Sequence, residues 1–200
     1  MRYEFVAIDL QNDFTSEGGL HFRLHECVDF LKQTLFPFLL KHNIKVSEIV
    51  SDYRQPRPGD SDESCVPGTW GYESIVPRGQ VKSQWVKCMN SPLWTRDNAG
   101  ISGVQPGLPR QDVPGFSKWL DENVGKREDI TPVLFGLTID CCVLSTAQEL
   151  NWRGYYPIVL KEGVDHYSGM SDKKESVIIT PLPNWAKVIT WDELHPLLTD

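Results

Sequence analysis

Hydrophobic residues along the chain gather in short runs separated by polar stretches. The runs at residues 5–8 and 132–135 lack the alternation of a half-exposed strand, so each predicts a strand that is buried on both faces. Shorter or more mixed apolar runs predict further strands at residues 45–51, 83–86, 156–160 and 186–190. After the fifth of these six runs in chain order we expect a polar loop that carries Asp165 and His166.

Apolar residues at helical spacing predict helices between these strands. The first apolar stripe is formed by Leu24, Val28, Leu31, Leu35 and Phe38, and we expect it to be kinked or to end near Pro37. A short helix is expected over residues 116–123, and another begins after Asp140, its expected N-cap, and ends at Gly154. Strands that alternate with helices predict an α/β fold, a three-layer αβα sandwich with a mostly parallel central sheet.

Length, charge and cysteine content limit the classes of function. A chain of 200 residues with 40% hydrophobic and 24% charged residues suits a single domain, residues 1–200. The net charge of -7 argues against nucleic acid or an anionic membrane surface as a partner and favours a small-molecule substrate. The first apolar run meets Asp9 after four residues, which is too short for a signal peptide or membrane span, so we expect a cytoplasmic protein. The odd number of cysteines, 5, predicts reduced thiols.

Chemically reactive side chains stand near the ends of three predicted strands: an aspartate, a lysine and a pair of cysteines. Asp9 follows the first strand, Lys87 the third, and Cys141 and Cys142 stand where a strand turns into a helix. In a parallel sheet, ligands bind beyond the carboxyl ends of the strands, so we expect an acid, a cation and a thiol to meet at one edge. Adjacent helical residues point about 100° apart, so only one of the two cysteines can face such a site.

These residue types suit nucleophilic catalysis by a thiol. A thiol is mostly protonated at neutral pH and needs a base before it can attack a carbonyl carbon. Asp9 could take that proton, while Lys87 would keep the aspartate ionised and favour the thiolate. Backbone N–H groups of Thr138 and Cys142 could form an oxyanion hole. The predicted reaction is hydrolysis of a C–N bond through an acyl-enzyme.

The segments 6–14, 86–87 and 136–147 resemble the three signatures of the isochorismatase-like cysteine hydrolases, a superfamily that includes nicotinamidases, N-carbamoylsarcosine amidases and isochorismatases. The resemblance implies a Rossmann-like αβα fold with Asp9 as base, Lys87 as its partner and Cys142, which directly precedes Val-x-x-Thr-Ala, as nucleophile. It also implies a cis peptide bond between Leu137 and Thr138 and assembly into a homo-oligomer, a dimer or larger.

The chain departs from the nicotinamidase pattern at the positions of the metal ligands. The segments 52–54 and 64–71 resemble the corresponding nicotinamidase segments, but Arg54 and Ser64 replace the ligand histidines. Asp52 and Asp60 remain as oxygen donors, which are too few and too hard for a zinc site. We therefore predict no metal and no other cofactor. Arg54 could instead bind a substrate carboxylate, or form a surface salt bridge.

Aromatic side chains supply candidates for the pocket wall, and two histidines supply a candidate metal pair. Phe14, Tyr53, Trp70 and Trp94 could line a pocket for a small planar or apolar substrate, although ordinary packing is the better explanation for each of them taken alone. His21 and His25 have a spacing that can hold a metal on a helix. No glutamate of the His-Glu-x-x-His kind lies between them, so we expect surface or capping histidines.

Three other functions remain open at this point. A vinyl-ether hydrolase of the isochorismatase type would not need the thiol of Cys142. A non-catalytic ligand-binding member would keep the fold without a reactive thiol, and a redox module would join Cys141 and Cys142 in a disulfide. The presence of Asp9, Lys87 and Cys142 together favours the amidase interpretation.

Overall fold

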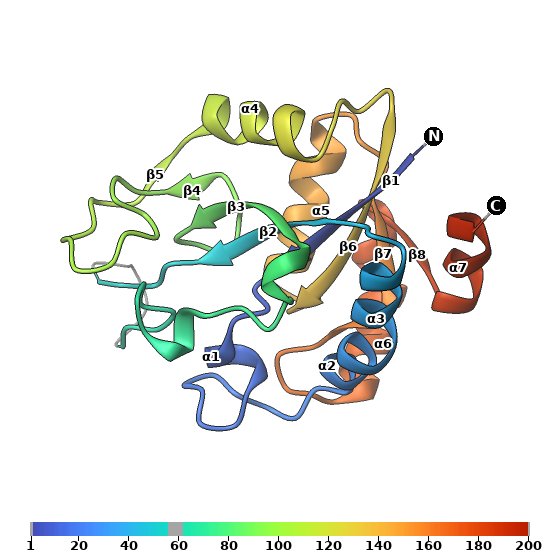
Figure 1. Cartoon of the computed structure of the whole chain (residues 1–200), viewed down its shortest axis with the longest axis horizontal. Coiled ribbons are helices and arrows are strands. Elements are labelled where there is room, and N and C mark those ends of the chain that lie inside the picture. The colour runs from blue at the N-terminus through green and yellow to red at the C-terminus, as the bar shows by residue number, and fades with distance from the viewer. Residues whose placement is uncertain (1, 56–61, 200) are drawn as a thin grey trace.

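A six-stranded parallel sheet forms the centre of the computed structural model, which describes residues 2–55 and 62–199 (Figure 1). The strand order is β3-β2-β1-β6-β7-β8, and every neighbouring pair is parallel. The strands are β1 (Arg2–Ile8), β2 (Val46–Ser51), β3 (Val81–Lys87), β6 (Ile130–Leu137), β7 (Ile158–Asp165) and β8 (Lys187–Ile189). This arrangement confirms the α/β class and the parallel sheet predicted from the apolar runs.

Helices cover both faces of the sheet, which explains the continuous apolar runs in β1 at residues 5–8 and in β6 at residues 132–135. In β1, Phe5 and Ala7 face one hydrophobic core, while Val6 and Ile8 face the other. The first core is closed by α3 (Phe36–Lys41) and α7 (Trp191–Thr199), and the second by α4 (Val113–Asn123) and α5 (Cys142–Trp152). Every residue of β6 is buried, as expected of a strand between two helical layers.

Shorter elements complete the chain. They are α1 (Asn12–Thr15), α2 (Glu26–Phe30), α6 (Ser171–Ile179) and the two-stranded antiparallel sheet of β4 (Trp94–Thr95) and β5 (Arg110–Gln111). Turns of 3-10 helix lie at Trp70–Tyr72, Arg78–Gln80 and Leu182–Asn184.

Three details differ from the sequence predictions. The first helix was expected to be kinked or to end near Pro37. It does not end there: the helical run continues from α2 through the π-helical turn Leu31–Leu35 into α3, and this irregular turn lies directly before Phe36 and Pro37. The polar loop expected after residue 160 begins later, at His166, because β7 continues to Asp165. The helix α6 was not predicted from the sequence. None of its residues is buried, so it has no apolar stripe that would indicate a helix.

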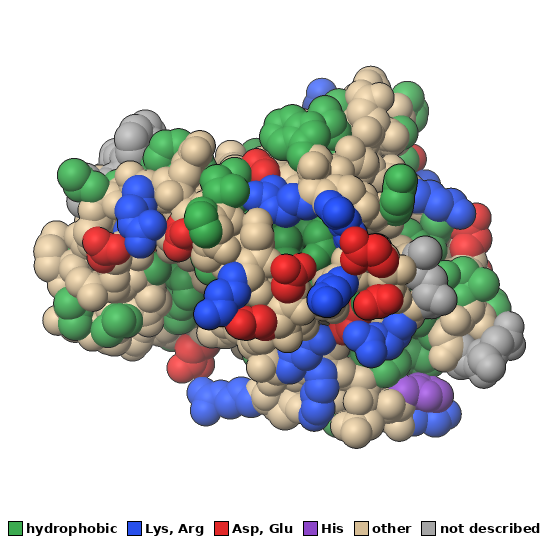
Figure 2. Space-filling view, turned by 90° about the horizontal axis from the view of Figure 1, so that it is seen from above, with side chains coloured by type: hydrophobic (Ala, Val, Ile, Leu, Met, Phe, Trp, Pro, Cys, Tyr) green, Lys and Arg blue, Asp and Glu red, His purple; other side chains and the backbone are tan. Residues whose placement is uncertain are grey.

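The surface carries charges of both signs. On the face shown in Figure 2, basic and acidic side chains are interspersed rather than grouped by sign. Within residues 2–55 and 62–199, no helix combines the length and the hydrophobicity that crossing a membrane requires.

Candidate active site at the carboxyl edge of the sheet

Asp9 lies directly beyond β1, at the edge where three neighbouring strands end. Its backbone has φ of 49°, a left-handed conformation that aspartate tolerates better than most residues, and its N–H donates to the carbonyl oxygen of Ile49 in β2. On the other side, Gly136 of β6 lies so close to β1 that a Cβ would stand 2.0 Å from the carbonyl oxygen of Ile8. The backbone of β6 can approach Asp9 because residue 136 has no side chain.

Lys87, the last residue of β3, brings the reactive groups together. Its side chain is fully buried, and its Nζ lies 2.8 Å from Oδ2 of Asp9. The ammonium donates to Oγ of Ser51 at 2.8 Å, to the hydroxyl of Tyr53 at 3.0 Å and to Sγ of Cys142 at 3.3 Å. The acid, the cation and the thiol that the sequence places far apart therefore meet in one buried cluster.

The carboxylate of Asp9 is only half engaged in hydrogen bonds. Its Oδ1 accepts from the hydroxyl of Ser51 at 2.8 Å. Its Oδ2 forms the ion pair with Lys87, but it accepts no hydrogen bond of ordinary geometry from the described residues. Asp9 is 1% exposed and lies beside a thiol, so its Oδ2, which has no such hydrogen bond, can accept a proton.

Only one of the two neighbouring cysteines faces this cluster. Cys142 is the first residue of α5, and its Sγ contacts Lys87, the hydroxyl of Tyr53 at 3.7 Å and Oδ1 of Asn90 at 3.7 Å. The Sγ of Cys141 lies 3.7 Å from Oδ2 of Asp140 instead. The N-cap of α5 is Cys141 rather than Asp140 as expected, because the Asp140 carboxylate accepts from the N–H of Tyr167. All five cysteines are free thiols.

Burial sets the resting charge of the cluster. Burial and then the negative charge of Asp9 raise the pKa of Cys142 to about 12, against the lowering effects of Lys87 and the Tyr53 hydrogen bond. Burial opposes the charge of Lys87, but Asp9, Cys142 and Tyr53 together keep the pKa of Lys87 well above its ordinary value. At neutral pH the cluster therefore holds a protonated thiol beside an ammonium group.

A cavity of about 240 Å³ opens onto the thiol. Its lining residues are Phe14, His21, Tyr53, Asn90, Leu137, Thr138, Cys141, Cys142 and Tyr167. Phe14 stacks on His21 with ring centroids 5.5 Å apart and meets Tyr53 edge to face at 6.3 Å. Phe14 and Tyr53 thus lie where the sequence analysis expected them. His21, Asn90 and Tyr167 were not identified, since they come from loops whose course no sequence pattern indicated.

Thr138 and Cys142, whose N–H groups were expected to form an oxyanion hole, both line the cavity. The peptide bond between Leu137 and Thr138 is cis, at the position that the resemblance indicates. The carbonyl oxygen of Thr138 accepts from the N–H groups of Cys141 and Val143. Within the described chain, the N–H groups of Thr138 and Cys142 donate to no backbone carbonyl, which leaves both available to a ligand oxygen.

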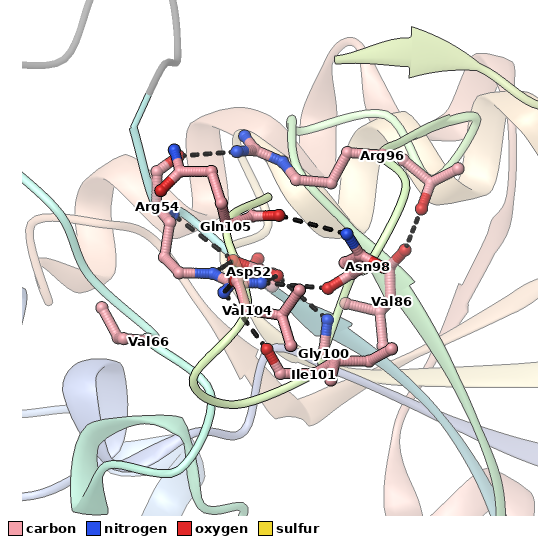
Figure 3. Close-up of polar contacts among 12 residues, drawn as sticks. Asp52, Arg54, Val66, Val86, Arg96, Asn98, Gly100, Ile101, Val104 and Gln105 are labelled. Atoms are coloured by element: carbon pink, nitrogen blue, oxygen red, sulfur yellow. Dashed lines mark hydrogen bonds and ion pairs between the residues drawn. The ribbon is translucent and has the colours of Figure 1, made fainter. Parts of the chain in front are cut away.

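Arg54 lies outside the cavity, in a buried ion pair with Asp52 (Figure 3). Its guanidinium donates twice to the Asp52 carboxylate, from Nε to Oδ1 at 2.9 Å and from Nη2 to Oδ2 at 2.6 Å. Its remaining donors bind the carbonyl oxygens of Asn98, Ile101 and Val104. The guanidinium is therefore committed to the loop at residues 98–104, and nothing in this geometry presents it to a substrate.

Trp70 and Trp94, two further candidates for the pocket wall, also lie outside the cavity lining. Trp70 is 50% exposed in the 3-10 turn Trp70–Tyr72, and its carbonyl oxygen accepts from Asn12. Trp94 is half-buried in β4. Both belong to the long loops whose paths the sequence did not reveal.

The residues at the positions that resemble the nicotinamidase metal ligands do not fit a metal site. Both oxygens of Asp52 are bound by the Arg54 guanidinium, and the hydroxyl of Ser64 lies 3.0 Å from Nε2 of His21. An arginine cation thus occupies the carboxylate that a metal would need. Asp60, the other oxygen donor considered, lies outside the described residues. In the described part of the chain, no group of three histidine, cysteine or acidic side chains is arranged to hold a metal ion.

His25 and His21 were expected to be surface or capping residues, and for both this is only partly right. His25 occupies the N-cap position of α2, but it is 4% exposed and its side chain makes no capping hydrogen bond. Its Nδ1 lies 4.0 Å from Oδ2 of Asp165, and burial lowers its pKa. His21 stacks on Phe14 in the cavity wall.

Solved structures share this fold over nearly the whole chain. An isochorismatase-like hydrolase from Alkaliphilus metalliredigens superposes with a TM-score of 0.69 at 20% identity, covering 98% of this chain and 96% of its own. A pyrazinamidase from Pyrococcus horikoshii, solved in complex with zinc, gives 0.66 at 17% identity, covering 96% of this chain and 100% of its own. An N-carbamoylsarcosine amidase from Thermoplasma acidophilum gives 0.60 at 20% identity, covering 95% and 96%.

Comparison of the sequence alone gives no match. No family model matches the chain, and no curated protein matches it. The structural similarity nevertheless extends over at least 95% of both chains in each of these comparisons. The protein therefore has the fold of the isochorismatase-like hydrolases.

Proposed function

We propose that the protein is a cysteine-dependent hydrolase that cleaves a C–N bond of a small, uncharged amide, ureide or carbamoyl compound. The observation that carries the proposal is the contact of the Cys142 thiol with Lys87, beside the half-engaged carboxylate of Asp9, at the floor of a cavity. The shared fold with hydrolases and amidases supports the same conclusion. No metal or cofactor takes part in the proposed reaction.

The thiol acts as the nucleophile in this scheme. Asp9 Oδ2 accepts the proton of Cys142 as Sγ attacks the carbonyl carbon, and Lys87 stabilises the negative charge that develops on sulfur. The N–H groups of Thr138 and Cys142 stabilise the oxyanion of the tetrahedral intermediate. The proton held by Asp9 then passes to the leaving nitrogen, and a water molecule hydrolyses the thioester and restores the thiol.

The raised pKa of Cys142 is consistent with this order of events. A thiol with a pKa of about 12 is almost entirely protonated at neutral pH, so the proton has to leave as the nucleophile attacks. An oxygen of Asp9 without a hydrogen bond is the acceptor that such a transfer needs.

The cavity wall favours an uncharged substrate. Its lining contains aromatic, amide and hydroxyl groups, and no lysine, arginine, aspartate or glutamate is among its described residues. Its volume of about 240 Å³ lies below the range of about 300–1,000 Å³ that is typical of pockets for drug-sized ligands. Flat neutral amides fit such a wall, whereas a carboxylate would find no lysine or arginine in the described lining, since the guanidinium of Arg54 is bound to Asp52.

A homo-oligomeric state and a cytoplasmic location stay predictions.

A substrate panel tests the proposal. Neutral aromatic and aliphatic primary amides, ureides and N-carbamoyl amino acids are incubated with the protein, and release of ammonia is measured. We expect turnover of neutral compounds, at least tenfold preference over carboxylates, and a loss of at least about ten-thousandfold in Cys142→Ala. Turnover that survives in Cys142→Ala would instead assign a thiol-independent reaction such as vinyl-ether hydrolysis and would overturn the proposal.

A further inference from the structure

The hydroxyl of Tyr53 lies between the ammonium of Lys87 and the sulfur of Cys142. It is 3.0 Å from Nζ of Lys87 and 3.7 Å from Sγ of Cys142. The residue is 5% exposed, and its backbone exchanges two hydrogen bonds with Ser64, from N–H to carbonyl in each direction. The phenol is therefore held in place beside the sulfur of Cys142.

The direction of these two hydrogen bonds follows from their chemistry. An ammonium group has three hydrogens and no acceptor, so in its contact with Lys87 the phenol oxygen accepts. The hydrogen of the phenol then remains available for the sulfur. Burial raises the pKa of Tyr53 well above its ordinary value, so the phenol keeps this hydrogen throughout the working range of pH.

We propose that Tyr53 is a catalytic residue, whose hydroxyl donates a hydrogen bond to Sγ of Cys142 and stabilises the thiolate at each step in which sulfur carries negative charge. The inference rests on the hydrolase function proposed above. When Asp9 takes the thiol proton, the electron pair stays on sulfur, and Tyr53 and Lys87 both donate to it. When water breaks the thioester, the sulfur leaves as a thiolate towards the same two donors. The phenol keeps its own hydrogen in both steps.

The substitution Tyr53→Phe removes this hydroxyl and little else. The ring of Tyr53 meets Phe14 edge to face and lies 5.1 Å from Nζ of Lys87, and a phenylalanine ring can keep both contacts. Lys87 keeps its contacts with Asp9, Ser51 and Cys142. A change in thiol reactivity is then attributable to the missing O–H group.

Alkylation of Cys142 by iodoacetamide measures thiol reactivity without any substrate. Because the pKa of Cys142 is raised to about 12, the parent rate should rise nearly tenfold per pH unit between about pH 7 and 9. A lost hydrogen bond to a charged group raises the thiol pKa by about one unit, so Tyr53→Phe should react about three to ten times more slowly at pH 8. We expect kcat to fall by about tenfold with a much smaller change in KM. Fragment-ion mass spectrometry separates labelling of Cys142 from that of Cys141.

Tyr155→Phe is the matched control, because Tyr155 is equally buried and its hydroxyl donates to the carbonyl oxygen of Gly125, outside the cavity. This variant should alkylate and turn over within twofold of the parent. Rates within twofold of the parent in Tyr53→Phe would overturn the proposal. If Cys142→Ala abolishes turnover while Tyr53→Phe has no effect, only the role of Tyr53 fails and the hydrolase function stands.

Replacement of Tyr53 by 3-fluorotyrosine keeps the shape of the side chain and tests the direction of the hydrogen bond. Fluorination makes the phenol a stronger donor and a weaker acceptor. If the hydroxyl donates to sulfur, alkylation of Cys142 should become faster. Slower alkylation would mean that the hydroxyl acts only as an acceptor for Lys87, which would overturn the proposal even if Tyr53→Phe folds poorly.

Discussion

Two buried acid–base pairs lie at the same edge of the sheet. Asp52 and Arg54 adjoin Tyr53 in the sequence, whereas Asp9 pairs with Lys87, which contacts the Tyr53 hydroxyl; the two pairs differ in their hydrogen bonding. Asp52 and Arg54 satisfy each other: the guanidinium makes five hydrogen bonds, and Oδ2 of Asp52 also accepts from the N–H of Gly100. In the pair of Asp9 and Lys87, Oδ2 of Asp9 is ion-paired with the ammonium but accepts no hydrogen bond of ordinary geometry from the described residues, and the ammonium also contacts a thiol.

The difference indicates which pair is structural and which is reactive. A fully hydrogen-bonded ion pair has no capacity left for a ligand, so the pair of Asp52 and Arg54 can only hold the loop at residues 98–104 against β2 (Figure 3). A buried carboxylate oxygen without a hydrogen bond is costly to keep, and such groups are found where a proton or substrate has to be received. Residue types alone do not separate these two roles.

The largest expected effect is on chemistry, in Asp9→Asn. The asparagine oxygen can still accept from Ser51, but the amide cannot take the proton of Cys142. We expect kcat to fall by about a thousandfold, within the range of general acid–base catalysis, as measured per folded molecule in the ammonia-release assay. A loss of less than tenfold would show that Asp9 is not the base, and the contrast between the two pairs would fail.

The second expected effect is on stability, in Arg54→Met. This variant leaves the carboxylate of Asp52 buried without its cation, which costs about 3–5 kcal/mol in the free energy of unfolding, measured by urea denaturation. Arg54→Lys keeps the charge but not the two-pronged contact and should cost less. Activity per folded molecule should stay within about fivefold of the parent in both.

Arg110→Met is the matched control for this prediction. Arg110 pairs with Asp97 in solvent, and exposed pairs contribute at most about 1 kcal/mol. If Arg54→Met were no more destabilising than Arg110→Met, the ion pair of Asp52 and Arg54 would not be what holds the loop at residues 98–104 in place. If Arg54→Met removed activity at full stability, Arg54 would belong to the active site after all.

The sequence was most informative where burial dictates composition. The apolar runs of β1 and β6 predict strands covered on both faces, and the parallel sheet that follows brings Asp9, Lys87 and Cys142 to one edge. Each of these residues is fixed by the end of a strand or the start of a helix, so their meeting depends on topology alone.

The parts that sequence reasoning missed are set by loops and by pairing. Asn90, His21 and Tyr167 enter the cavity from irregular segments, whose paths depend on long-range contacts such as that between Ser64 and His21. Arg54 resembled a substrate ligand because a guanidinium suits carboxylates. Its actual carboxylate is Asp52, two residues away, and nothing in the local pattern distinguishes the two cases.

The most direct test of the account is intact-mass spectrometry of the protein during turnover of a neutral amide found in the substrate panel. We predict an added mass equal to the acyl group, located on Cys142, retained in Cys141→Ser and absent from Cys142→Ala. Turnover without any adduct on Cys142, or an adduct on Cys141 instead, would contradict the claim that Cys142, Lys87 and Asp9 form the reactive centre.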